Sequence, residues 1–267
     1  MTQTLNHGVD ISDLIDRDKR EIDQRVYNDA AVHQMELDTI FSHAWIVLGH
    51  ASEIPKVGDY VTRQLGEDPV IVTRARDGEV RVLLNLCPHR GAEVCRSEYG
   101  NGAVFRCIYH GFVFNLDGSF RGAPYQKELF PENYDTSELH LKKARVTVRN
   151  EIIFATWDEK APSLEEYLGD FGWYLNAIFN RADYEVLGPP HRFMQRANWK
   201  TASEQFAGDG YHASQLHRSL ANLVPLDPND PKQWSLLDPT VGTDEGHTAV
   251  CFSTVSYTHL RAHETRP

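Results

Sequence analysis

Two short segments of the chain each carry one cysteine and one histidine beside a glycine. The first reads CPHRG and begins at Cys87, and the second reads CIYHG and begins at Cys107. Cysteine and histidine are the side chains that bind soft and borderline metals well. The 17 residues of 90–106 lie between His89 and Cys107. The pattern predicts a metal site and a fold that brings the two segments together.

The donor set by itself leaves two kinds of metal site open. A Cys₂His₂ zinc site is the default reading of two cysteines and two histidines. Zinc modules, however, usually pair Cys with Cys and His with His, whereas each segment here supplies one of each. That arrangement is typical of a binuclear iron–sulfur cluster in which two Cys hold one iron and two His hold the other. Histidine ligands also raise the reduction potential relative to an all-Cys cluster.

Composition and charge restrict the class of protein. The 267-residue chain has a net charge of −11 and no basic stripe, which argues against nucleic acid and suits a cationic protein partner. No run of about 18 apolar residues predicts a membrane span, and the N-terminus has no signal-peptide core. The expected location is therefore the cytoplasm, where thiols stay reduced. The four cysteines then suggest metal binding instead of disulfides, with Cys95 outside the ligand pattern as a small buried residue.

The periodicity of apolar residues predicts three regions along the chain. Residues 30–45 have helical spacing. Residues 46–157 consist of short β-branched runs separated by turn signals such as Asp77-Gly78 and Asp117-Gly118, which is typical of an antiparallel β domain. Residues 163–182 return to a helical stripe, with Ser163 and Glu166 as a capping box.

Together, CPHRG and the sequence CIYHGF resemble the two ligand loops of the Rieske [2Fe–2S] domain. The resemblance implies that the cluster is held by Cys87, His89, Cys107 and His110. Gly91 and Gly111 would let backbone N–H groups approach the cluster sulfurs, and both loops would lie at the tips of β-hairpins. Phe112 departs from the pattern, because relatives usually carry Trp at that position.

A second constellation lies in residues 198–217, which contain Asp209, His212 and His217. On a helix Asp209 and His212 share one face, whereas His217 lies about 140° further round. Spacing alone therefore leaves ordinary surface or core histidines as an open alternative. A kink beside Gly208 or Gly210 would be needed to aim both imidazoles at one metal.

The sequence NWK followed by EQFAGDGYH and a further His resembles the catalytic iron motif of Rieske non-haem iron oxygenases. The resemblance implies that His212 and His217 bind Fe(II) and that Asp209 links an iron ligand to the cluster of a neighbouring subunit. Gln205 would lie near the iron without binding it. The family's third ligand is a carboxylate far downstream, and no aspartate after His217 matches its context: Asp227, Asp230, Asp238 and Asp244. We therefore expect a truncated, inactive fragment with about half of the family pattern.

These observations predict an α+β protein. An antiparallel β Rieske [2Fe–2S] domain would be followed by the incomplete start of an α+β, helix-grip-like catalytic domain. The expected division is a helical segment at 1–44, the Rieske domain at 45–158, the mononuclear-iron domain at 159–255 and a non-native tail at 256–267.

The resemblance implies the terminal oxygenase component of an aromatic-ring-hydroxylating dioxygenase, which forms a cis-diol from an aromatic ring with O₂ and NADH-derived electrons. The alternatives are a Rieske-type monooxygenase or demethylase and a Rieske electron-transfer protein without a working iron site. The implied partners are a ferredoxin or an NADH-dependent reductase and a small β subunit, in a homotrimer or an α3β3 assembly, and the implied substrate is a small aromatic molecule. Neither nucleic acid nor a membrane is expected as a partner.

Overall fold

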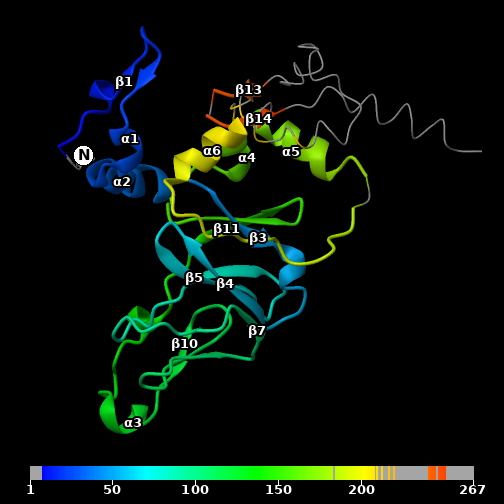
Figure 1. The fold of residues 1–267 in the computed structure, drawn as a ribbon. Helices are drawn as coiled ribbons and strands as arrows, with labels where there is room; N and C mark the ends of the chain where they lie inside the picture. The colour runs from blue at the N-terminus through cyan, green and yellow to red at the C-terminus, as the bar shows by residue number, and fades with distance from the viewer. Residues whose placement is uncertain are drawn as a thin grey trace, which may run out of the picture. The chain divides into compact units, whose positions relative to one another are not determined.

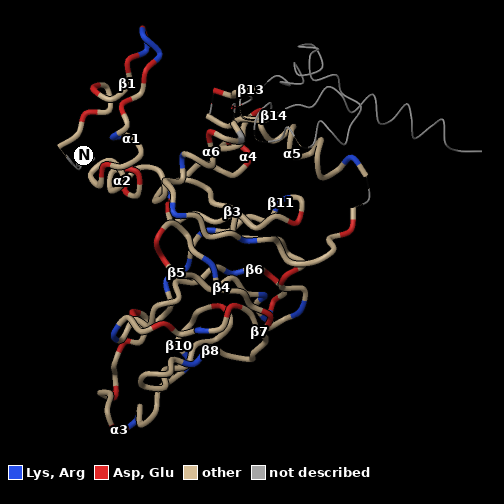
Figure 2. Tube along the Cα trace, viewed as in Figure 1, with Lys and Arg blue, Asp and Glu red and all other residues tan. Residues whose placement is uncertain are grey.

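The computed structural model describes residues 8–182, 184–207, 209, 212, 216, 219, 240–244 and 246–250 (Figure 1). The described residues fall into two compact units. One lies within Met1–Leu164 and Phe179–Phe193, and the other within Glu165–Ile178 and Met194–Pro267. Figure 2 shows acidic and basic residues interspersed along the described chain. Within the part of the chain that the structure describes, no helix has the length and apolar character needed to cross a bilayer.

The first unit begins with short elements. These are η1 (Ile11–Asp13), β1 (Ile15–Asp16), β2 (Glu21–Ile22), α1 (Arg25–Asn28), α2 (Ala30–Glu36) and the π-helical turn η2 (Leu37–Phe41). Asp29 caps α2 by accepting a hydrogen bond from the Ala31 N–H at 2.8 Å, which satisfies one of the free donors of its first turn. The helix predicted over residues 30–45 is thus present, but it ends before the chain enters β3.

A four-stranded antiparallel sheet lies at the centre of this unit. It consists of β4 (Asp59–Leu65), β5 (Asp68–Arg74), β6 (Val80–Leu84) and β7 (Tyr99–Asn101), in the order β6-β5-β4-β7. The predicted Asp77-Gly78 turn joins β5 to β6, with Gly78 at a φ of 85°. Successive side chains of a strand point to opposite faces. Accordingly, Ile71 belongs to one hydrophobic core, whereas Val70 and Val72 belong to the other.

A three-stranded sheet packs over the face that carries Val70 and Val72. It contains β3 (Ile46–His50), β11 (Arg145–Arg149) and β12 (Ile152–Thr156), in the order β11-β12-β3. The short helix η3 (Ala51–Glu53) follows β3. Leu48, Ile153 and Ala155 supply this sheet's buried side chains to the shared core. The antiparallel β structure predicted up to residue 157 is present here as the β11–β12 pair.

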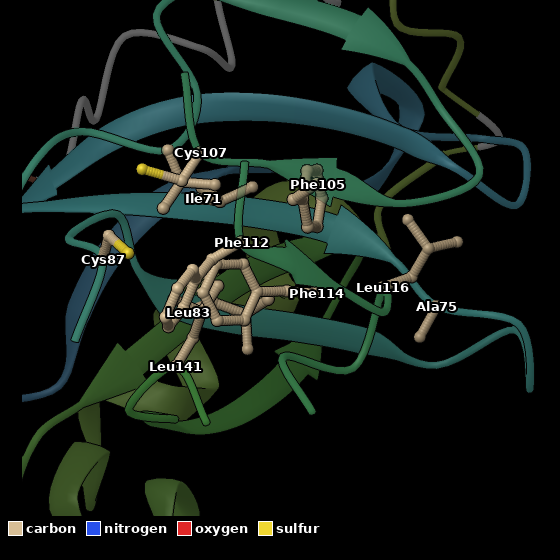
Figure 3. Close-up of a cluster of buried hydrophobic side chains, with 11 residues drawn as sticks. Ile71, Ala75, Leu83, Cys87, Phe105, Cys107, Phe112, Phe114, Leu116 and Leu141 are labelled. Atoms are coloured by element: carbon tan, nitrogen blue, oxygen red, sulfur yellow. The ribbon is translucent and has the colours of Figure 1, made fainter. Parts of the chain in front are cut away.

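The opposite face, which carries Ile71 and Leu83, is covered by the ligand loops and a small sheet. That sheet is β8 (Phe105–Arg106), β9 (Val113–Phe114) and β10 (Phe120–Gly122), in the order β10-β9-β8. The helices α3 (Gln126–Leu129) and η4 (Ser137–Leu139) follow. Figure 3 shows this core, with Cys87 and Cys107 at one edge of the cluster in that view and Phe112 and Phe114 within it.

The second unit contains α4 (Leu164–Leu168), α5 (Phe171–Phe179), α6 (Trp199–Ala207) and the hairpin of β13 (Thr240–Gly242) and β14 (Thr248–Val250). The single helix predicted over residues 163–182 is wrong in one respect: it is two helices, interrupted at Gly169, whose φ is 47°. His247 Nε2 donates a hydrogen bond of 2.8 Å to the Tyr167 carbonyl, which ties the hairpin to α4. The antiparallel sheets and these helices confirm the predicted α+β class.

Candidate metal centres

The two Cys–His loops share one backbone conformation. In the first, the Cys87 N–H donates to the Ala92 carbonyl and the Gly91 N–H donates to the Cys87 carbonyl, both at 2.8 Å. In the second, Cys107 donates to the Phe112 carbonyl at 2.8 Å, and Gly111 donates to the Cys107 carbonyl at 3.0 Å. The loops are therefore structural copies, even though His follows Cys by two positions in one loop and by three in the other.

Each loop requires glycine at its fifth position, four residues after the cysteine. Gly91 has a φ of 67° and Gly111 a φ of 72°, values that disfavour any residue with a Cβ. A Cβ at Gly111 would also lie 2.8 Å from Cγ of Pro124, so this loop has a steric reason as well. The antiparallel bridge between Leu86 and Glu93 closes the first loop, and the β8–β9 pair closes the second. The predicted placement at hairpin tips is confirmed.

The two cysteines lie at the inner end of the loops. Their side chains are free and buried, at 3% exposure for Cys87 and 1% for Cys107. Burial raises the pKa of the Cys87 thiol, and the adjacent Cys107 side chain raises it further. The backbone N–H groups of His89 and Arg90 act in the opposite direction, because they donate to the Cys87 sulfur and favour the thiolate.

The two histidines lie at the outer end. The imidazoles of His89 and His110 are both exposed, with ring centroids 4.6 Å apart and planes at 70°. Partial desolvation lowers the pKa of His89, and the nearby His110 and Arg90 lower it further. The lowered pKa favours the neutral imidazole, which is the form that binds a metal.

The chemistry of the four donors fits a binuclear cluster. Such a cluster takes two protein ligands on each iron, whereas a zinc site takes all four on one ion. The structure pairs sulfur with sulfur and imidazole with imidazole, so each pair can serve one iron. Among the residues that the structure describes, no three His, Cys, Asp or Glu side chains are grouped as ligands of a single ion.

Two residues that sequence reasoning missed support the loops. Asn85, only 2% exposed, donates to the Cys95 carbonyl at 2.7 Å and accepts from the Cys95 N–H at 2.8 Å. It thereby joins the two ends of the first loop. Pro124 packs against Gly111 from outside both loops. In the sequence, the only pointer to Asn85 was its position two residues before Cys87. Because its side chain is buried, the amide must form hydrogen bonds within the protein.

The second candidate site begins just after α6. Asp209 and His212 are in contact: the His212 N–H donates to Asp209 Oδ1 at 3.3 Å, and His212 Nδ1 lies 3.7 Å from Asp209 Oδ2. His212 Nδ1 also meets the Asp209 carbonyl. The structure thus joins these two predicted residues. Gln205 lies on α6, and Asp244 is exposed in the β13–β14 turn.

Several sequence-based predictions lie outside the described residues. These are the iron ligand His217, the flanking Gly208 and Gly210, the aspartates Asp227, Asp230 and Asp238, and the tail at 256–267.

Comparison with known proteins assigns both halves of the chain. Residues 44–143 match the model of the Rieske [2Fe-2S] domain, and residues 164–265 match the ring hydroxylating alpha subunit catalytic domain. The N,N-dimethyl phenylurea N-demethylase subunit alpha of Sphingobium sp. (strain YBL2) is 44% identical over 79% of this chain and 48% of its own length. The chlorobenzene dioxygenase subunit alpha of Cupriavidus sp. (strain PS12) is 39% identical over 86% of this chain and 51% of its own length.

A solved structure of a dioxygenase is also similar to this chain. The naphthalene 1,2-dioxygenase from Rhodococcus sp., bound to indole, is 42% identical and superposes with a TM-score of 0.73 over 79% of this chain and 48% of that one. The chain thus spans about half the length of the curated relatives it matches. A Rieske domain carries a [2Fe–2S] cluster, and the ring-hydroxylating catalytic domain carries a mononuclear iron. The chain thus contains a Rieske [2Fe–2S] domain followed by a ring hydroxylating alpha subunit catalytic domain, and the relatives it matches include dioxygenase alpha subunits.

Proposed function

We propose that the chain acts in the terminal oxygenase of an aromatic-ring-hydroxylating dioxygenase. Cys87 and Cys107 hold one iron of the [2Fe–2S] cluster, and His89 and His110 hold the other. His212 and His217 hold the mononuclear Fe(II), with Asp209 beside His212. We propose the same division of the chain as the sequence predicts, with the Rieske domain at 45–158 and the iron domain from 159.

One observation carries the proposal: the two ligand loops are hydrogen-bonded copies that place a buried pair of cysteines below an exposed pair of histidines. Burial protects the sulfur end from water, and exposure of the imidazole end suits exchange of electrons with a partner. The two iron centres, when bound, supply stored electrons and an open coordination position for dioxygen.

The protein residues have separate tasks in this scheme. The backbone N–H groups of His89 and Arg90 stabilise negative charge on the Cys87 sulfur. Asp209 orients the His212 imidazole through the contact described above, as carboxylates commonly do for metal-binding histidines. Overall, an arene, O₂, NADH and one proton give a cis-dihydrodiol and NAD⁺, with both oxygen atoms retained in the product.

The partners follow from the need for electrons. We propose that a ferredoxin or an NADH-dependent reductase delivers them to the exposed histidine end of the cluster. A small β subunit and an assembly of three alpha subunits complete the proposed enzyme. A small aromatic molecule is the substrate class.

An N-demethylase is the second candidate function, because the N,N-dimethyl phenylurea N-demethylase subunit alpha is 44% identical to this chain. In that reaction an N-methyl group, O₂, NADH and one proton give the demethylated amine, formaldehyde, water and NAD⁺. Labelling with ¹⁸O₂ separates the two. A dioxygenase places both labelled atoms in a diol, whereas a demethylase releases formaldehyde and labelled water.

The metal content tests the proposal directly. Anaerobically purified chain is expected to be red-brown, to give a Rieske-type EPR signal when reduced, and to contain acid-labile sulfide. Three irons per chain support both centres, and two irons support an electron carrier without the mononuclear site. A colourless protein with one zinc would overturn the cluster assignment.

A further inference from the structure

The ring of Phe112 stacks on the imidazole of His89. Their centroids are 4.9 Å apart and their planes differ by only 7°. Phe112 itself is buried, at 7% exposure, whereas His89 is exposed. The second contact of the His89 ring is His110, at 70° to it. An exposed imidazole on a loop is therefore held against one face of a buried ring.

Phe112 connects the two ligand loops. Its carbonyl accepts the hydrogen bond from the Cys107 N–H that closes the second loop. Its side chain contacts the histidine of the first loop. Phe112 thus links the two loops, because its carbonyl binds Cys107 and its ring contacts His89.

The ring of Phe112 also packs against two other aromatic side chains. Phe120 lies 5.3 Å away with its plane at 55°, and Phe130 lies 6.4 Å away at 54°. Such tilted aromatic pairs are favourable beyond the area that they bury. The stack on His89 is therefore continuous with the aromatic packing at the edge of the core.

We propose that Phe112 is a positioning residue for the cluster: it sets the plane of the His89 imidazole. The reason is conformational, because the terminal torsion of a histidine side chain is broad and allows many ring orientations. A parallel phenyl face restricts that torsion before iron binds. The inference rests on the proposed assignment of His89 as a cluster ligand.

The proposal requires a flat ring at position 112, and volume alone is insufficient. Phe112→Tyr and Phe112→Trp keep a ring face against His89. Phe112→Leu and Phe112→Met keep apolar volume but remove the face, and Met fills irregular gaps well. Phe120→Leu is the matched control, since Phe120 shares the same core and contacts Phe112 and Phe114. It removes an equal ring from the packing around the stack.

The test uses the full chain, purified anaerobically with its cluster. For each variant, the reduced cluster is examined by EPR, its midpoint potential is measured, and its loss in a chelator is timed from the visible absorption. Phe112→Leu and Phe112→Met are expected to broaden the g-values and to lose the cluster about 2- to 10-fold faster, the range of one aromatic contact. The Tyr, Trp and Phe120→Leu variants are expected to retain the wild-type line shape.

Two results would overturn the inference. If Phe112→Leu and Phe112→Met match Phe120→Leu in line shape and cluster loss, Phe112 serves packing only. If the Tyr and Trp variants broaden the signal as much as Leu does, the ring face is irrelevant. A wild-type chain that takes up no [2Fe–2S] cluster would overturn the proposed function together with this inference, so the two failures are distinguishable.

Discussion

The imidazoles of His89 and His110 lie with their ring centroids 4.6 Å apart, although they come from two different loops. Two cationic imidazoles would repel each other at this separation. Their approach is therefore explained by the loops, whose matching hydrogen bonds place both rings at the same end. The short distance between the rings is what a metal cluster requires, because both imidazoles can then bind the same iron.

Replacing His89 with Cys should convert the donor set towards that of an all-Cys cluster. The reduction potential should fall by about 100 mV or more, because histidine ligands raise the potential of these clusters. A redox titration followed by EPR measures the shift. His191→Cys adds a thiol at an exposed histidine of the same unit and should leave the potential unchanged. An unaltered potential in His89→Cys would exclude His89 as a ligand.

Asp209→Ala should leave iron and sulfide contents close to those of the parent protein. In a full-length version that also carries the third iron ligand, turnover of the assembled oxygenase with its electron donors should fall by about 10- to 100-fold, because the variant loses the carboxylate that orients His212. Metal analysis and NADH-dependent O₂ uptake check the two parts. Asp244→Ala, at an exposed acid in the β13–β14 turn, is the control. Normal turnover in Asp209→Ala would show that Asp209 is not needed to orient His212.

Cys95 should resist alkylation in the native protein. Burial raises the pKa of its thiol to about 12. Only the thiolate reacts, and at pH 8 about one molecule in 10⁴ would carry it. Mass mapping after iodoacetamide treatment is expected to find Cys95 modified only once urea is added. Rapid native labelling at Cys95, judged against a Cys95→Ser sample, would show that this thiol is accessible.

The hydrogen bond between His43 and Asp158 should make stability depend on pH. His43 Nδ1 lies 2.8 Å from Asp158 Oδ2, and this hydrogen bond is the main cause that lowers the pKa of Asp158, followed by the Lys160 N–H. A carboxyl whose pKa is lower in the folded state stabilises above its unfolded pKa of about 3.9 and loses that effect as pH falls through the folded pKa.

Asp158→Asn should therefore lower the melting temperature slightly at pH 6, and the difference should shrink towards zero below about pH 3. Thermal melts of both proteins across that range provide the measurement. In a His43→Gln background the effect of Asp158→Asn should be smaller at pH 6. A difference that persists unchanged at pH 2.5 would mean that packing, and not charge, is responsible.

Much of the site was readable because its chemistry is local in the chain. Cys87 and His89 are two positions apart, Cys107 and His110 are three apart, and a metal can be held only by a few residue types. The turn between β5 and β6 was equally local, because Asp77-Gly78 determines a tight hairpin with a positive φ at Gly78. Such features depend on neighbours in sequence, so a single sequence reveals them.

Other features depended on contacts that the sequence does not display. Helix periodicity continued through Gly169, yet this glycine adopts a φ of 47° and divides the predicted helix into α4 and α5. From the sequence, Phe112 was only a difference from the Trp that relatives usually carry. The fold shows that its ring stacks on His89. The sequence thus determined the donor types and their local spacing, since these follow from covalent order. Tertiary structure decided which rings and thiols meet, because those contacts join strands and loops that are distant in the chain.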